Sequence, residues 1–323
     1  MFDHIHIIGA GAIGGLIGAH LTKKLGKSRV TLVDNDPVHV EAIRERGLKI
    51  FDEGAKPPWS ETVDVEITTP GELNFSDATD IIVAVKAYSN GDVLPHLSKE
   101  ANLLVLQNGW DERLNSFANA VRSVEFGFAC KVDQPGLVYN AVKGRYLLGT
   151  CDGNSEKAEP WAELLSSAGI DSRTAENITG YVWSKVLVNS CLNPVSAIFD
   201  YSFGEVVGNE RSRQLFRELY LEGYLVIKRH CRELGQKPGS LIGPPGLIYT
   251  LSKSRVLSDC LLKAAAGKFG NVESSMLQDV RRNRPTEIDF INGQIIALGK
   301  RLGMDTPKNK WIYDEIKKME PHA

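Results

Sequence analysis

The sequence predicts an α/β domain followed by an all-helical domain. Short apolar segments alternate with helical patterns over the first half of the chain, as expected for strand–helix–strand units around a parallel sheet. After Asn154 long amphipathic patterns follow one another and strand-like segments become rare. The length of 323 residues, at about 150 residues per domain, also favours two domains. We expect the first domain at residues 1–176 and the helical domain at residues 177–323.

The composition is that of an ordinary folded protein. Hydrophobic residues make up 42% and charged residues 24% of the chain, which excludes disorder, collagen-like repeats and a coiled coil as the main architecture. The balance of 38 Lys and Arg against 40 Asp and Glu gives no reason to expect nucleic acid or an anionic membrane as a partner. No segment approaches the roughly 18 apolar residues of a membrane span. Scattered cysteines without a CxxC pair favour a reducing compartment, and we expect a cytoplasmic protein.

In the first half, the apolar pattern gives the order of the elements. The expected strands are His4–Ile8, Arg29–Val33, Asp80–Val85, Asn102–Leu106, 123–129, 136–140 and 145–149, and the expected helices are Gly14–Leu25 and Val38–Arg46. Residues 51–70 are less regular. The Pro57-Pro58 pair argues against a central strand there, because proline cannot donate to a sheet ladder.

In the second half, the helical period predicts five helices. They are expected at 156–168, 179–192, 204–234, 254–265 and 287–302. The connector 238–245 is rich in proline and glycine. It is interpreted as a loop between helices or, alternatively, as a mobile flap.

A glycine-rich turn lies between the first predicted strand and helix. Gly9, Gly11 and Gly14 have the spacing GxGxxG, with Ala12 and Ile13 between the second and third glycine. The first glycine permits a tight turn, the second a close approach of backbone to a pyrophosphate, and the third close helix–sheet packing. Phosphates would lie at the positive end of the helix. The turn therefore predicts a Rossmann-type dinucleotide-binding domain.

Asp34 ends the second predicted strand. A carboxylate at this place can accept hydrogen bonds from the adenosine ribose hydroxyls and repel a 2′-phosphate, which favours NADH over NADPH. Alternatively, Asp34 caps the next helix beside Asn35 and Asp36, with Pro37 at the first helical position. The sequence leaves both interpretations open.

Three polar side chains recur at spacings of four in the segment 183–198. Lys185, Asn189 and Asn193 would share one face of a helix, among apolar neighbours. Such side chains need polar partners, because each buried, unpaired amide costs about 1–3 kcal/mol. The partners could belong to a ligand, or to a helix end near Pro194.

A second polar block covers residues 274–293. Thr286 could cap a helix whose first turn carries Glu287 and Asp289, where acidic residues complement the helix dipole. Capping would explain Glu287 as a structural residue. The basic run 281–284 lacks the interleaved aromatic residues of a nucleic-acid site and is typical of a solvated surface.

Taken together, these segments resemble the ketopantoate reductase (2-dehydropantoate 2-reductase) family over nearly the whole chain. The matching motifs are GAGAIGG at 9–15, VKAY at 85–88, LQNG at 106–109, KxxxNxxxNP at 185–194 and SSMLQDVRRNRPTEIDFINGQII at 274–296. The resemblance implies reduction of ketopantoate to (R)-pantoate, for pantothenate and coenzyme A synthesis. It also implies an active site in the cleft between a nucleotide domain and a helical domain.

The resemblance further implies roles for individual residues. Lys185 would be the catalytic general acid, and Glu287 would form hydrogen bonds near the lysine and the cofactor. Substrate would be bound by Asn189, Asn193 and Ser275. Lys86 and Asn108 would contact the cofactor and line the nicotinamide side of the cleft, where Asn108 would also meet the substrate. Hydride transfer leaves negative charge on the former carbonyl oxygen, and a positioned ammonium that donates a proton there typically contributes about 10²–10⁴-fold.

The sequence departs from the family at the cofactor. The family commonly uses NADPH and has a basic residue near the end of the second strand, where this chain has Asp34-Asn35-Asp36. The resemblance therefore implies NADPH, whereas Asp34 favours NADH.

Two alternatives to a ketopantoate reductase remain. One is a D-2-hydroxyacid dehydrogenase of the same family that acts on other branched or aromatic 2-oxo acids. The other is a nucleotide-sensing regulatory protein without turnover. We expect no metal, because His4 and His6 lack a third ligand, and we expect either a homodimer or a monomer.

Overall fold

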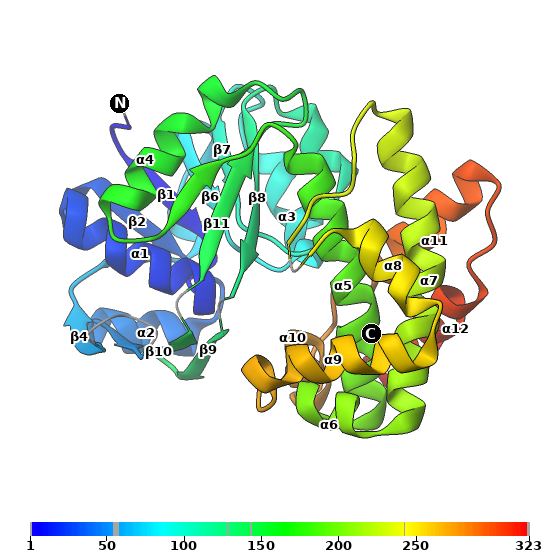
Figure 1. Cartoon of the computed structure of the whole chain (residues 1–323). Coiled ribbons are helices and arrows are strands. Elements are labelled where there is room, and N and C mark those ends of the chain that lie inside the picture. Colours follow the sequence, from blue (N-terminus) through cyan, green and yellow to red (C-terminus); the bar gives the residue numbers. More distant parts are fainter. Residues whose placement is uncertain (1, 54–57, 128, 143, 242, 322–323) are drawn as a thin grey trace. The chain divides into compact units, whose positions relative to one another are not determined.

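The computed structural model describes residues 2–53, 58–127, 129–142, 144–241 and 243–321, which form two compact units (Figure 1). Unit 1 consists of Met1–Gln107 and Glu112–Ile178, and unit 2 consists of Asn108–Asp111 and Thr179–Ala323. Unit 1 is α/β and unit 2 is helical, which confirms the predicted fold class. The four residues Asn108–Asp111 join the second unit although their neighbours in sequence belong to the first.

The main sheet of unit 1 has eight strands in the order β12-β11-β8-β7-β6-β1-β2-β5. The strands are β1 (Ile5–Ile8), β2 (Val30–Val33), β5 (Glu66–Thr68), β6 (Asp80–Val83), β7 (Asn102–Val105), β8 (Ala120–Phe126), β11 (Arg145–Gly149) and β12 (Ser172–Thr174). The neighbouring strands β8, β7, β6, β1, β2 and β5 all run parallel, whereas β11 is antiparallel to β8. The sheet is therefore mixed, which corrects the expectation of a purely parallel one.

Both faces of this sheet are buried, as its continuous apolar strands predict. Ile82 and Leu104 pack into one core, together with α1 (Ala12–Leu25) and α4 (Glu159–Ser167). Their neighbours Ile81 and Leu103 point to the other face, into a second core near α3 (Asn90–Val93).

A second sheet of four strands packs against α1, in the order β4-β3-β10-β9. Its strands are β3 (Leu48–Asp52), β4 (Trp59–Val63), β9 (Ala129–Gln134) and β10 (Leu137–Val142), and β4, β9 and β10 lie near α2 (Pro37–Arg46) in Figure 1. The sequence did not predict this sheet. Residues 51 and 52 end the central strand β3, which corrects the expectation of no central strand in the segment 51–70; β4 and β5, in the rest of that segment, occupy sheet edges. Pro57 itself lies outside the described residues.

Unit 2 consists mainly of α-helices, joined by turns and two longer connectors. They are α5 (Ile178–Phe199), α6 (Phe203–Gly208), α7 (Glu210–Glu233), α8 (Pro245–Ser252), α9 (Arg255–Phe269), α10 (Ser275–Arg281), α11 (Asn292–Leu302) and α12 (Pro307–Met319). No helix in the described ranges is both long enough and apolar enough to cross a membrane.

Three predicted helices differ from the observed ones. Helix α5 continues seven residues beyond the predicted end at Leu192 and passes Pro194. The predicted helix 204–234 is divided at Asn209, whose side chain accepts hydrogen bonds from the backbone N–H groups of Arg211 and Ser212 and so begins a new helix. The predicted helix at 287 starts with a short 3₁₀ turn, Ile288–Phe290, and α11 begins only at Asn292.

The cap of α2 is Asp36, which corrects the alternative that Asp34 caps this helix. The Asp36 carboxylate accepts hydrogen bonds from the backbone N–H groups of Val38 at 3.0 Å and His39 at 3.2 Å. Pro37 occupies the first helical position, where a missing N–H has no consequence.

Replacing Asp36 by alanine is expected to lower the free energy of unfolding by about 1 kcal/mol, since two N–H groups of the first helical turn lose their acceptor. Urea denaturation followed by circular dichroism measures this change. Asn35→Ala, at the exposed neighbouring position, is the matched control and should change stability much less. Equal losses in the two variants would contradict the assignment of the cap.

Candidate active site

The glycine turn, Asp34 and Lys86 follow three neighbouring parallel strands. In the ladder Ile8 lies opposite both Val33 of β2 and Val83 of β6, so the carboxyl ends of the three strands share one edge of the sheet. The chain leaves β1 towards β2 and later returns to add β6 on the other side. Ligands of open α/β sheets bind outside the carboxyl ends of the strands at such a switch point.

Two side chains hold the backbone of Ala10 in the glycine turn, one at its N–H and one at its carbonyl. The Ala10 N–H donates to Asp34 Oδ2 at 2.7 Å, and the Ala10 carbonyl accepts a hydrogen bond from His39 Nε2 at 3.0 Å. His39 Nδ1 in turn accepts from the Gly136 N–H at 3.1 Å, which fixes the tautomer. His39 is buried and was not singled out in the sequence, where nothing distinguishes it from other histidines.

The three glycines are required for different reasons. A Cβ on Gly14 would lie 1.8 Å from the Gly9 carbonyl oxygen; Gly9 has φ +99°, and a Cβ there would lie 2.8 Å from the Val85 nitrogen. A Cβ on Gly11, in contrast, would meet no protein atom within 4 Å. The fold therefore needs Gly9 and Gly14, whereas Gly11 leaves open space beside the first turn of α1.

The start of α1 beside this open space is the candidate site for a pyrophosphate. The first turn of α1, which begins with Ala12 and Ile13, has no side-chain cap and no acidic residue. The first N–H groups of a helix have no intrahelical acceptor and attract anions. Lys86 is half-buried at the same sheet edge and precedes the 3₁₀ turn Ala87–Ser89. Its carbonyl oxygen accepts a hydrogen bond from the Ser89 N–H.

In unit 2, helix α5 carries the polar stripe predicted from the sequence. Lys185 and Asn189 are half-buried, and Asn193 is 6% exposed. At 1.5 Å of rise per residue the stripe covers about 12 Å of one helix face. The helix does not end at Pro194, so the alternative that the stripe serves a helix end there is wrong.

The Lys185 end of the stripe is tied to two other segments of unit 2. Trp183 stacks on Trp110, with ring centroids 5.1 Å apart. The Trp110 N–H donates to the Phe290 carbonyl oxygen at 2.9 Å. Gly109 has φ +84°, and a Cβ there would lie 2.5 Å from the same oxygen. The segment of Asn108 and the 3₁₀ turn that follows Glu287 are thus held together beside α5.

Glu287 itself is buried, with 4% of its surface exposed. It precedes the 3₁₀ turn, whose first N–H groups are served by Thr286: the Thr286 hydroxyl oxygen accepts from the Ile288 N–H at 3.2 Å. Thr286 is thus an acceptor for this turn, whereas the helix expected from Glu287 begins only at Asn292 and has no side-chain cap. Capping does not account for Glu287.

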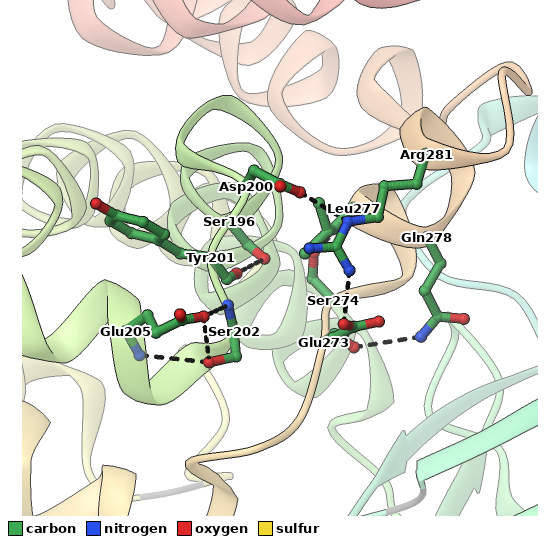
Figure 2. Close-up of polar contacts among 10 residues, drawn as sticks. All are labelled: Ser196, Asp200, Tyr201, Ser202, Glu205, Glu273, Ser274, Leu277, Gln278 and Arg281. Atoms are coloured by element: carbon green, nitrogen blue, oxygen red, sulfur yellow. Dashed lines mark hydrogen bonds and ion pairs between the residues drawn. The ribbon is translucent and has the colours of Figure 1, made fainter.

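The Asn193 end of the stripe is joined to α10, the helix that begins with Ser275. Figure 2 shows the neighbouring contacts of Arg281 with Asp200 and Glu273. The Ser274 hydroxyl caps α10 through the Leu277 N–H at 3.1 Å and donates to the Asn193 carbonyl oxygen at 3.4 Å. Arg281 donates to Asp200, just after α5, at 2.7 Å and to Glu273 at 2.6 Å. Arg281 and the other three residues of the run 281–284 are exposed, as expected for a solvated surface.

The structure also describes the surroundings of His4 and one contact of the connector 238–245. His4 bonds to the Ser28 carbonyl oxygen at 3.1 Å and to the Thr31 hydroxyl at 2.9 Å, and the described residues contain no group of three or more His, Cys, Asp or Glu placed to hold a metal. The connector 238–245 is tied to α5 at Gly239, whose N–H donates to the Gly180 carbonyl oxygen at 2.8 Å.

Comparison with known proteins decides the family. Residues 5–153 match the family profile "Ketopantoate reductase PanE/ApbA", and residues 177–320 match its C-terminal counterpart. The chain belongs to the ketopantoate reductase family. It is 31% identical to the 2-dehydropantoate 2-reductase of Pyrococcus abyssi and 30% identical to that of Pyrococcus horikoshii, over 98% of this chain and 97% of each relative. The resemblance found in the sequence and the prediction of an oxidoreductase are confirmed.

Solved structures share the fold of ketopantoate reductases. A PanE/ApbA family ketopantoate reductase from Ralstonia eutropha JMP134 superimposes with a TM-score of 0.79 at 25% identity, over 98% of both chains. The ternary structure of D-mandelate dehydrogenase with NADH and anilino(oxo)acetate gives a TM-score of 0.80 at 22% identity, again over 98% of both chains. The Rossmann-type unit followed by a helical unit is therefore the fold of this family.

Gly11→Ala is expected to leave the free energy of unfolding within about 0.5 kcal/mol of the original, because the new methyl group meets no protein atom. It should weaken NADH binding at least about tenfold, since the methyl group would occupy the space open to the pyrophosphate. Isothermal titration calorimetry and urea denaturation measure the two quantities.

Gly14→Ala is the matched control and should behave in the opposite way. Its methyl group overlaps the Gly9 carbonyl, so stability should fall by about 1–3 kcal/mol or more. Unchanged NADH affinity in a folded Gly11→Ala variant would exclude this turn as the pyrophosphate site.

Proposed function

We propose that the chain reduces 2-dehydropantoate (ketopantoate) to (R)-pantoate with a nicotinamide cofactor, as a step towards pantothenate and coenzyme A. The observation that carries this proposal is the polar stripe on α5: Ser274, the residue before Ser275, is bonded to its Asn193 end, and the Asn108 and Glu287 segments are tied to its Lys185 end. The membership of the whole chain in the family supports the reaction class.

Lys185 is proposed as the general acid. Reduction of a ketone at C2 places negative charge on the former carbonyl oxygen, and the Lys185 ammonium would stabilise this charge and donate a proton from Nζ. The dinucleotide, held at the edge of the sheet in unit 1, would supply the hydride. Glu287 would orient the lysine or accept a hydrogen bond from a substrate hydroxyl.

Neutral side chains are proposed to bind the rest of the substrate. Asn189 and Asn193 offer amide donors and acceptors, and Ser275 offers a hydroxyl at the start of α10. These groups can bind carboxylate and hydroxyl oxygens without a positive charge that would compete with Lys185 for the developing oxyanion. Asn108 would contribute a further amide on the side of the nicotinamide.

NADH is proposed as the preferred cofactor. Asp34 accepts hydrogen bonds from the N–H groups of Ala10 and Asp36, and a carboxylate has about four acceptor positions, so room remains for ribose hydroxyls. Its charge disfavours a 2′-phosphate at the same place. Arg44 on α2 bonds to Glu72 at 2.5 Å and is thereby engaged away from a phosphate.

The proposal extends to assembly and location. A homodimer or a monomer is expected; a dimeric ketopantoate reductase of Staphylococcus aureus shares the fold. A cytoplasmic location is proposed from the cysteine pattern in the sequence.

The glycine turn alone would suffice for a nucleotide sensor, whereas the polar stripe with its supporting contacts favours an enzyme.

Lys185→Ala is expected to lower kcat about a thousandfold, in the range of about 10²–10⁴-fold that general acid catalysis typically contributes. NADH affinity should change less than twofold, because the glycine turn belongs to the other unit. Stopped-flow absorbance of NADH measures the rate. Lys228→Ala, an exposed lysine of α7, is the matched control; turnover near wild type in the Lys185 variant would disprove its role.

A panel of 2-oxo acids with each cofactor tests the substrate and the cofactor. Ketopantoate is expected to exceed 2-oxoisovalerate and phenylglyoxylate in kcat/KM by at least about tenfold, or 1.4 kcal/mol, with NADH preferred over NADPH. A preference for phenylglyoxylate would instead establish a D-2-hydroxyacid dehydrogenase. Absence of oxidation of either cofactor with every acid would favour a sensor.

A further inference from the structure

Pro194 creates a gap in the hydrogen bonds of α5. In an α-helix each carbonyl oxygen accepts from the N–H four residues later, so the Ser190 carbonyl would be paired with residue 194. Proline has no N–H. Ser190 is 0% exposed, and an unpaired carbonyl at such a place is costly. Ser190 directly follows Asn189 and Pro194 directly follows Asn193, so the gap adjoins both amides of the polar stripe.

Asn292 supplies the missing donor. Its Nδ2 donates to the Ser190 carbonyl oxygen at 3.0 Å, across 102 positions of sequence. Asn292 is the first residue of α11 and is 0% exposed. The Asn292 side chain of α11 therefore takes the place of a missing backbone N–H of α5.

A carboxylate fixes the orientation of this amide. An ionised Glu222 carboxylate accepts hydrogen bonds but donates none. Its Oε1 accepts a hydrogen bond from Asn309 Nδ2 at 2.8 Å. Asn309 Oδ1 consequently faces Asn292 and accepts its Nδ2 at 3.0 Å. Asn292 thus uses both amide hydrogens, one towards Asn309 and one towards Ser190, while its own Oδ1 has no hydrogen-bond partner among the described residues. Asn292 is therefore held in place only by the hydrogen bonds that its amide donates.

We propose that Asn292 is a positioning residue for the substrate face of α5. By closing the gap at Pro194 it keeps α5 helical from Lys185 to Asn193, so that the two asparagines and the lysine keep one common face. The proposal rests on the proposed substrate role of Asn189 and Asn193. Asn292 itself acts through the α5 backbone and is assigned no contact with substrate.

Asn292→Ala tests the proposal by separating binding from stability. We expect KM for the 2-oxo acid to rise at least fivefold while Kd for NADH changes less than twofold. Ile295→Ala is the matched control: Ile295 is 0% exposed, lies one turn later on α11 and leaves the Ser190 bond intact. It should lower Tm with KM within twofold of wild type. If both variants lower Tm and neither changes KM, Asn292 is merely structural and the proposal is wrong.

Pro194→Ala provides a rescue, because alanine at this position restores the N–H that the Ser190 carbonyl lacks. In the Pro194→Ala background, Asn292→Ala is expected to change KM less than twofold. Equal effects of Asn292→Ala in the two backgrounds would overturn the proposal.

Amide hydrogen exchange gives a readout that needs no turnover. In Asn292→Ala, or in Asn292→Ser if the alanine variant does not fold, protection should fall in residues 190–199 and persist in residues 178–186. Unchanged protection would overturn the proposal even if the Pro194 variants are unfolded. If the wild-type protein reduces no 2-oxo acid, the proposed function fails, whereas the exchange experiment still decides whether Asn292 closes the gap.

Discussion

The Ser190 carbonyl is a buried acceptor in the helix that carries the polar stripe, and residues of three other helices contribute to pairing it. Asn292 at the start of α11 donates to it, and Asn309 of α12 and Glu222 of α7 hold Asn292 in orientation. The same Glu222 carboxylate accepts the first-turn N–H groups of Lys308 and Asn309, and so also begins α12. One hydrogen-bonded chain therefore links four helices of unit 2, and α5 can pass Pro194 without ending.

A comparable constraint organises the nucleotide end of unit 1. Ala10 is held at its N–H by Asp34 and at its carbonyl by His39, so the glycine turn has a fixed shape before any ligand binds. Preorganisation of this kind reduces the conformational entropy lost on binding. Asp34 thereby has a structural role beside any contact with ribose. Substituting it would disturb the turn as well as the choice of cofactor, and a change in cofactor preference alone could not be assigned to lost repulsion.

The features predicted from sequence are those with local causes. The strand, turn and helix around GxGxxG and the four-residue spacing of Lys185, Asn189 and Asn193 depend on neighbours along the chain, and the structure has the glycine turn and the helical stripe in these places. The course of α5 past Pro194 depends instead on a residue 102 positions away, and local propensity at proline predicts a break. Likewise, Asn108–Asp111 joins unit 2 because Gly109 and Trp110 meet Phe290, a contact that no pattern within LQNG reveals.

The residues of the proposed site are divided between the two units. The glycine turn, Asp34 and Lys86 belong to unit 1, and Lys185, Asn189, Asn193, Ser275, Asn108 and Glu287 belong to unit 2. The stripe on α5 contains one ammonium and two neutral amides, so in the proposed reaction the positive charge would lie beside the developing oxyanion and the amides would orient the substrate. A chain with nearly balanced charge cannot attract an anionic acid by its overall field. Its affinity must therefore come from a few placed groups, and the geometry of α5 is what places them.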